Sequence, residues 1–193
     1  MEGNNNNSIS NSINNQINDA RFVWVDLEMT GLDPSQEVIL EIAVLITDNQ
    51  MNVIAEGPRL VISQPESILE EMNDWCKEHH GESGLIAEVR ESDFSIIDAK
   101  MQVLDFIKQH CKKGKAYLAG NSIHMDRMFL HKYMPEILEY LHYRILDVSS
   151  FKVLRETCYP DVLEFEKKKT HRALDDIKES IAELKYYQEK LFK

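Results

Sequence analysis

The sequence predicts an α/β fold in which a mixed β-sheet is flanked by helices, and two observations indicate it. The first is a series of three strand-like segments with short connections, which is typical of an antiparallel meander. The second is a later region in which strand-like and helical segments alternate, the order found where helices pack on a sheet. At 193 residues, the chain has the length of one ordinary domain.

The antiparallel part is expected between residues 22 and 63. Residues 22–28 are rich in β-branched and aromatic side chains and predict the first strand, and residues 31–34 contain the glycine and proline of a turn. Residues 38–47 form an apolar run interrupted only by Glu41, and residues 59–63 predict a third strand.

Helices are expected near residues 66–80, 85–91 and 95–111. In the last of these, apolar side chains recur at helical spacing at Ile97, Met101, Leu104 and Ile107. This spacing supports the third of these helices.

The second half of the chain predicts the alternating region. A buried strand is expected at 115–120, followed by a helix whose first turns hold Asp126. A short strand at 144–148 and a short helix at 150–158 come next. The last helix is expected over 172–191, with an apolar face at Ile177, Ile181 and Leu184.

Residues 1–20 consist mostly of Asn, Ser and isolated Ile. Such a segment buries too little apolar surface to offset the entropy lost on ordering. We therefore expect a disordered Asn-rich tail over 1–20 and a folded domain over 21–193.

The composition excludes several classes of protein. The chain has 22 Lys and Arg against 33 Asp and Glu, a net charge of −11, which excludes a polycation that coats nucleic acid. Its 43% hydrophobic content suffices for a core and excludes a disordered polyampholyte. A run of about 18 apolar residues is missing from the sequence, so we expect no membrane-spanning helix.

The cysteines and the N-terminal segment bear on the compartment. The three cysteines are widely spaced without a CxxC pair, which favours a reducing compartment over a disulfide framework. Residues 1–20 show no secretory signal, and they contain Glu2 and Asp19 but no Lys or Arg, which fits a mitochondrial presequence poorly. We expect a cytoplasmic protein, with mitochondria as the alternative.

Asp26 and Glu28 are the most informative residues of the first strand. Side chains two apart on a strand share a face, so these carboxylates lie side by side. They would repel each other and resist desolvation unless a cation lies between them. The alternative is a strand whose outer face is simply wet.

Three positions elsewhere in the sequence favour a cation site over a wet outer face. Asp126 lies just inside a helix, where it could instead pair with Arg127 or Lys132. His171 and Asp176 are five residues apart at the start of the last helix. They could instead serve as a helix cap and a carboxylate in the first turn that interacts with the helix dipole. The adjacent His79 and His80 stand without a matching set of ligands.

Together these residues form a known pattern. The segments WVDLEMTGLDP (24–34), GNSIHMDRMFLHKYMPE (120–136) and THRALDDIKES (170–180) resemble those of the DEDDh exonucleases, and the resemblance is strongest to the oligoribonuclease family. It covers residues 22–192 and includes AEGP (55–58), MNDW (72–75) and HYRILDVSS (142–150).

The resemblance implies an RNase H-like fold with a mixed five-stranded sheet, and an active site with two Mg²⁺ or Mn²⁺ ions. It places the four acidic metal ligands at Asp26, Glu28, Asp126 and Asp176, and the general base at His171. Asp26 would bridge both ions, and Asp126 would support one of them through water. Asp175 is off the motif.

The resemblance also implies the substrate, which is short single-stranded RNA cleaved from its 3′ end down to dinucleotides. Leu32 resembles the apolar wedge between the terminal bases, although a turn leucine could also pack on the core. Ser122 is a candidate hydrogen-bond donor near the 3′ nucleotide. Trp75 and Tyr143 resemble base-stacking aromatics, with core packing as the alternative for Trp75.

Members of the family generally work as homodimers, which implies a second copy of this chain as partner but no other protein and no membrane. The contact with the 5′-phosphate, partly from the second subunit, would come from Arg144 and Ser149, with Lys152 a weaker candidate. Two alternatives remain: a DEDDh exonuclease that prefers DNA 3′ ends or longer RNA, and a non-catalytic RNA-binding module.

Overall fold

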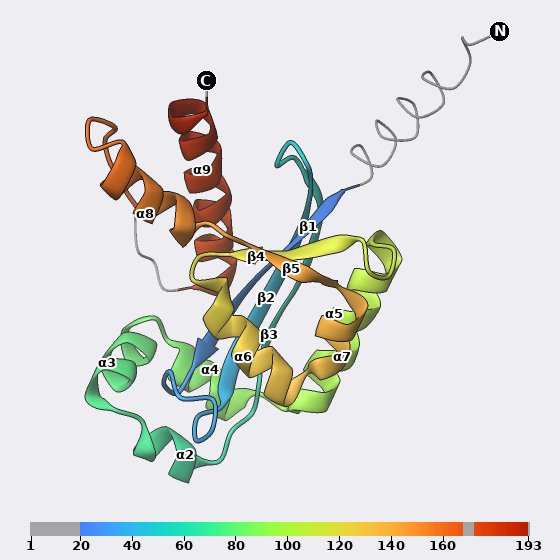
Figure 1. Ribbon diagram of the computed structural model, residues 1–193. Helices are drawn as coiled ribbons and strands as arrows, with labels where there is room; N and C mark the ends of the chain where they lie inside the picture. The colour runs from blue at the N-terminus through green and yellow to red at the C-terminus, as the bar shows by residue number, and fades with distance from the viewer. Residues whose placement is uncertain (1–19, 168–171, 193) are drawn as a thin grey trace, which may run out of the picture.

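Residues 20–167 and 172–192 are described by the computed structural model. Five strands form one sheet in the order β3-β2-β1-β4-β5 (Figure 1). Strands β1 (Arg21–Met29), β2 (Ile39–Asp48) and β3 (Val53–Val61) pair antiparallel. Strands β4 (Ala116–Gly120) and β5 (His142–Asp147) extend the sheet from β1 in parallel. The predicted mixed sheet, an antiparallel meander followed by parallel strands, is confirmed.

Helices flank this sheet, as expected for an RNase H-like fold. They are α2 (Glu66–Glu71), α3 (Asp74–Glu82), α4 (Leu85–Glu91), α5 (Ile96–His110), α6 (Ile123–Tyr133), α7 (Pro135–Tyr140), α8 (Ser149–Cys158) and α9 (Ala173–Leu191). None of these helices has both the length and the apolar content needed to span a bilayer.

The alternation of side chains along β1 divides the core into two layers. Val23, Val25 and Leu27 pack into a large cluster with residues of α5, α6 and α7. Trp24 faces the other way, into a second cluster that contains Ile177 and other residues of α9. Since successive side chains of a strand point to opposite faces, the even-numbered positions of β1 look toward α9.

Several boundaries differ from the sequence prediction. Strand β3 begins at Val53, six residues before the predicted start. The single helix expected at 66–80 is two helices, because Asn73 accepts a hydrogen bond from the amide of Cys76 and begins α3. Helix α7, which begins at Pro135, was not predicted. The expected tail lies almost entirely outside the described residues, so the boundary at residue 20 stays a prediction.

Helix α5 is confirmed, and it buries only part of the apolar series that predicted it. Ile97 and Met101 are more than half exposed, whereas Ala99, Val103 and Ile107 are buried against the sheet. The helix carries apolar side chains on two sides, and the side with the smaller residues approaches the sheet. That approach is close: a Cβ atom on Gly57 of β3 would lie 2.5 Å from the Phe106 ring.

Candidate active site

Strand β1 and helix α9 bring three carboxylates together. Asp26 and Glu28 occupy even-numbered positions of β1, on the face that α9 covers, and Asp176 lies in the first turn of α9. One carboxylate oxygen from each of the three lies within 4.8 Å of the other two. Figure 1 shows the end of β1 and the start of α9 meeting at one end of the sheet. We call Asp26, Glu28 and Asp176 the carboxylate cluster.

Asp126 joins this region from the first turn of α6. Its side chain is 6% exposed, and it accepts a hydrogen bond of 2.9 Å from the backbone amide of Leu27, the residue between Asp26 and Glu28. The alternative partner Lys132 donates instead to the carbonyl of Ser35. The Asp126 side chain is therefore attached to β1.

Burial raises the pKa values of Asp26, Glu28 and Asp126, and neighbouring carboxylates add to the shifts. The pKa of Asp26 lies well above its ordinary value, because burial disfavours the charged form and Asp126, Glu28 and Asp176 add repulsion. Burial, with Glu41 and Asp176, raises the pKa of Glu28 to about 8. Burial also raises the pKa of Asp126 to about 7. A cation in the cluster would oppose these shifts, because it favours the charged form of each carboxylate.

His80 is a neighbour of the cluster that the sequence did not reveal. It is 3% exposed, and its Nε2 hydrogen-bonds to the carbonyl of Met29 at 2.9 Å. Its Nδ1 lies 3.8 Å from Oε2 of Glu28. The carboxylate cluster does not include His80, which agrees with the expectation that His79 and His80 lack a matching set of ligands. The fold nevertheless brings His80 beside Glu28, because α3 lies against the end of β1.

The structure describes residues 172–180 of the segment THRALDDIKES (170–180). His171, the predicted general base, lies outside the described residues. Asp175 is exposed, in keeping with its position off the motif, whereas Asp176 is partly buried. The amide of Asp176 donates a hydrogen bond to the carbonyl of Arg172 at 3.0 Å.

Two of the predicted substrate contacts are exposed apolar side chains. Leu32, in the turn after β1, is 69% exposed, so the alternative that it packs on the core is wrong. Trp75 is 57% exposed and stacks on the ring of His79 at 3.9 Å between centroids. Core packing is therefore also wrong for Trp75.

Ser122 and Ser149 lie together. The amide of Ser122 donates to Oγ of Ser149 at 2.9 Å, and the two hydroxyl oxygens are 3.1 Å apart. Ser149 also donates to Oδ1 of Asn121, whose amide nitrogen reaches Ser180 on α9. Asp147 accepts a hydrogen bond from the amide of Ser149. Asn121 thus connects Ser149 to α9. The sequence analysis did not identify this residue, although it lies beside Ser122.

Tyr143 and Arg144 form a separate group on the edge strand β5. Tyr143 is 70% exposed, and the guanidinium carbon of Arg144 lies 5.2 Å from the centre of its ring. Lys152, the weaker phosphate candidate, pairs with Glu164 at 2.6 Å. Within one chain, Ser149 therefore belongs with Ser122, whereas Arg144 belongs with Tyr143.

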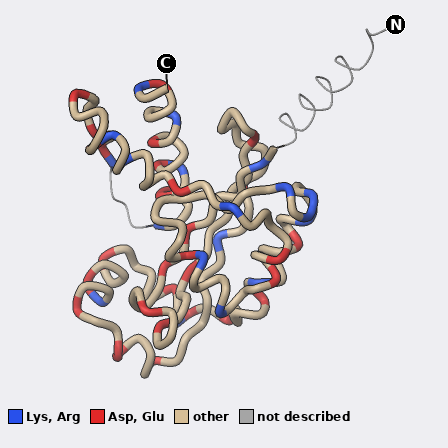
Figure 2. The backbone as a smooth tube through the Cα atoms, in the orientation of Figure 1, with Lys and Arg blue, Asp and Glu red and all other residues tan. Residues whose placement is uncertain are grey.

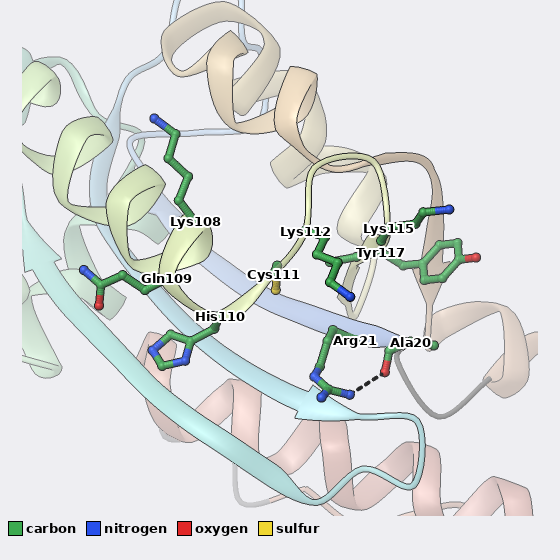
Figure 3. A pocket seen from close by; sticks show the side chains of 10 residues that line it. Ala20, Arg21, Lys108, Gln109, His110, Cys111, Lys112, Lys115 and Tyr117 are labelled. Carbon is green, nitrogen blue, oxygen red and sulfur yellow. Dashed lines mark hydrogen bonds between the residues drawn. The ribbon is translucent and has the colours of Figure 1, made fainter. Parts of the chain in front are cut away.

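A group of basic side chains lies elsewhere in the described part of the molecule. Figure 2 shows Lys and Arg gathered at the turn between α5 and β4. A pocket of about 570 Å³ lies there, at the start of β1, and Figure 3 shows the side chains that line it. Its cations are Arg21, Lys108, Lys112 and Lys115. Lys108 lies in the last turn of α5, where positive charge interacts favourably with the helix dipole.

Solved structures share the fold. An exonuclease I from Methylocaldum szegediense superposes with a TM-score of 0.70 at 16% identity, over 90% of this chain. The E. coli exonuclease I complex with single-stranded DNA, in its zinc-bound form, gives 0.69 at 14% identity. The present chain spans 41% of each of those chains.

Curated relatives are far closer in sequence. The human protein named mitochondrial oligoribonuclease is 53% identical over 90% of this chain and 74% of its own length. The oligoribonuclease of Vibrio campbellii is 53% identical over 92% of this chain and 98% of its own length. A probable oligoribonuclease of Dictyostelium discoideum is 54% identical, with 90% and 91% covered. The Exonuclease family (RNase T) matches residues 23–184. The chain therefore belongs to the Exonuclease family and, within it, to the oligoribonucleases.

Proposed function

We propose that this nuclease is a 3′–5′ exoribonuclease that hydrolyses very short oligoribonucleotides, down to dinucleotides, to nucleoside 5′-monophosphates. The observation that carries the proposal is the carboxylate cluster, in a chain whose curated relatives are named oligoribonucleases. Three acids within 4.8 Å of one another would be costly to keep charged unless they bind cations.

The residues present fit divalent metal ions. All members of the cluster are carboxylates, the hard oxygen donors that Mg²⁺ and Mn²⁺ prefer over thiols. Burial and neighbouring carboxylates raise the pKa values of Asp26 and Glu28, and this supports a counter-charge in the cluster. We assign Asp26, Glu28 and Asp176 as direct ligands and Asp126 as a ligand acting through water, with Mg²⁺ or Mn²⁺ as the ion.

Two such ions, when bound, activate the attacking water and stabilise charge on the leaving oxygen. The protein contributes the positions of the acids: Asp126 is held on β1 by Leu27, and Asp176 by the first turn of α9. We assign His171 as the general base that takes a proton from the attacking water. The ordinary pKa of histidine, near 6.5, suits that task.

The exposed side chains beside the cluster would hold the 3′ end of the substrate. Leu32 would insert between the two terminal bases, and Trp75 would stack on a base. Stacking of this kind contributes about 1–3 kcal/mol per base and accepts any sequence. Ser122 would donate a hydrogen bond to the 3′ nucleotide.

The 5′ end of the substrate would meet the edge strand of a second copy of the chain. We assign Tyr143 as a stacking residue, with Arg144 and Ser149 as contacts to the 5′-phosphate. The exposure of Tyr143 on an edge strand supports a homodimer in which β5 contributes to the partner's site. A wall of this kind at the 5′ end would favour short RNA, because longer chains would have to pass it.

The compartment and the domain boundary are part of the same proposal. We assign the enzyme to the cytoplasm, with mitochondria as the alternative in view of the human relative's name. The Asn-rich residues 1–20 are assigned as a tail that hydrolysis does not need, so a variant lacking residues 2–20 should keep its turnover in vitro. Loss of turnover would move the domain boundary toward the N-terminus.

A length series tests the substrate. Purified protein with Mg²⁺ or Mn²⁺ would receive 5′-labelled RNAs of two to about ten nucleotides and the matching DNAs. We expect kcat/KM to be highest for the RNA dinucleotide. Equal rates at all lengths, or a preference for DNA, would favour the alternative, a DEDDh exonuclease acting on longer RNA or DNA 3′ ends. A protein that binds these RNAs without cleaving them would be a binding module.

A further inference from the structure

Four charged side chains of alternating sign run beside the carboxylate cluster. They belong to four different segments: Glu41 on β2, Arg59 on β3, Glu88 on α4 and Arg172 directly before α9. Each contacts the next at 2.6–2.7 Å. We call these four residues the charge chain.

The charge chain begins next to β1, the strand that carries Asp26 and Glu28. Glu41 is fully buried and lies directly opposite Glu28 in the pairing of β1 with β2. Like charges in opposite positions destabilise a sheet, and a buried carboxylate requires a partner. Arg59 supplies it with two parallel hydrogen bonds, from Nε at 2.9 Å and from Nη2 at 2.6 Å.

The charge chain ends at the start of α9. Glu88 accepts hydrogen bonds from both arginines, at 2.6 Å from Arg59 and at 2.7 Å from Arg172. Arg172 also donates to the carbonyl of Ser83 at 2.6 Å, so its guanidinium is held at two points. Among the residues that the structure describes, Arg172 is the N-cap of α9, and its side chain makes no capping hydrogen bond. The hydrogen bonds of Arg172 to Ser83 and Glu88 therefore fix where the helix starts, in place of a capping side chain.

Asp176 depends on that start. Its amide donates to the carbonyl of Arg172, which places it one turn into the helix. The two ends of the charge chain thus lie beside the two halves of the carboxylate cluster: Glu41 adjoins Glu28 on the sheet, and Arg172 lies one turn before Asp176.

We propose that the charge chain sets the position of Asp176 relative to Asp26 and Glu28, so that Glu88 and Arg172 are positioning residues for metal binding. The inference rests on the proposed function, because it assumes that the cluster binds a divalent cation. Loss of a partner outside the first coordination shell typically lowers metal affinity 10- to 100-fold.

Two variants test the proposal. Glu88→Gln removes the charge that joins the two arginines. Arg172→Lys keeps the positive charge but cannot reach Ser83 and Glu88 with one planar group. The matched control is Arg90→Gln, on the same helix, which breaks the exposed pair of Arg90 with Glu66. Mn²⁺ alone would be titrated into each full-length protein by calorimetry, with Asp26→Ala as the variant that lacks a ligand, and folding would be checked by circular dichroism.

We expect Glu88→Gln to bind Mn²⁺ about tenfold more weakly than the wild type, Arg172→Lys to bind with intermediate affinity, and Arg90→Gln to bind normally. The proposal would be overturned if Glu88→Gln and Arg172→Lys both bound Mn²⁺ with wild-type affinity. It would also be overturned if Arg90→Gln lost as much Mn²⁺ affinity as they do. If Glu88→Gln does not fold, Arg172→Lys decides. A wild type that binds Mn²⁺ no better than Asp26→Ala would instead refute the metal site itself.

Discussion

The backbone amide of Leu27 donates a hydrogen bond to the carboxylate of Asp126 at 2.9 Å. Leu27 lies between Asp26 and Glu28, so this bond attaches α6 to the part of β1 that carries two of the three clustered acids. Asp126 therefore has two separable roles, one as a hydrogen-bond acceptor and one as a charge.

Substitutions at Asp126 should separate these roles. Asp126→Asn keeps an oxygen that can accept from Leu27, so its free energy of unfolding should stay close to that of the wild type, while dinucleotide hydrolysis falls by about 10- to 100-fold. Asp126→Ala leaves the buried amide without a partner and should lose a further 1–3 kcal/mol or so of stability. Urea unfolding and initial rates measure the two effects. Equal stability of the two variants would contradict the structural role.

Asp26→Ala should abolish turnover while the fold survives. Removal of this carboxylate relieves both its own desolvation and its repulsion of Asp126, Glu28 and Asp176, so the free energy of unfolding without metal should be unchanged or higher. Rates and urea unfolding in EDTA measure this. Near-normal hydrolysis by the variant would refute the metal-dependent mechanism.

The adjacent pair Asp175 and Asp176 offers an internal control. Asp175 is exposed and Asp176 reaches the cluster. Asp175→Ala should keep its activity and its Mn²⁺ affinity, whereas Asp176→Ala should lose both, as measured by dinucleotide hydrolysis and calorimetry. The opposite result would mean that α9 is rotated from its position in the structure.

Without metal, the protein should lose stability as the pH rises from about 4.5 to about 8. The pKa of Glu28 is raised from 4.5 to about 8, so over this range the folded protein keeps a proton that the unfolded chain releases. This contribution to stability is full below pH 4.5 and is lost by pH 8. Relative to Glu28→Gln, the wild type should lose about 1–4 kcal/mol between pH 5 and pH 8 in EDTA, and Mg²⁺ should restore it. Parallel stability curves for the two proteins would contradict the shift.

Trp75→Ala should weaken substrate binding without affecting the fold. The side chain is more than half exposed, so the substitution should change the free energy of unfolding by less than about 0.5 kcal/mol. Loss of stacking should raise the KM for a dinucleotide by about 5- to 150-fold. Val53→Ala, an equally exposed apolar residue at the start of β3, is the control. An unchanged KM for Trp75→Ala would remove this residue from the substrate site.

The sequence predicted the strands and most of the helices, because the patterns that mark them are local. Alternation along β1 was enough to place Asp26 and Glu28 on one face, and the structure adds that this face is covered by α9. Contacts between distant segments were not predictable in this way. Glu88 meets Arg59 across 29 residues and Arg172 across 84, and no local pattern marks either pair.

The same limit explains what the sequence left open. The buried side of α5 could not be chosen from periodicity, because the helix carries apolar residues on two sides. His80 has no motif of its own and acquires a neighbour in Glu28 only after α3 packs against β1.

The proposed metal ligands are distributed along the whole chain, and this has a consequence for biosynthesis. Asp26 is present early in synthesis, whereas Asp176 belongs to α9, the last helix that the structure describes. A nascent chain, or a fragment that ends before α9, has an incomplete ligand set however well its sheet has formed. Hydrolytic competence would thus begin only when the final helix has been made and has docked, so truncated products of this nuclease would be harmless to the RNA around them.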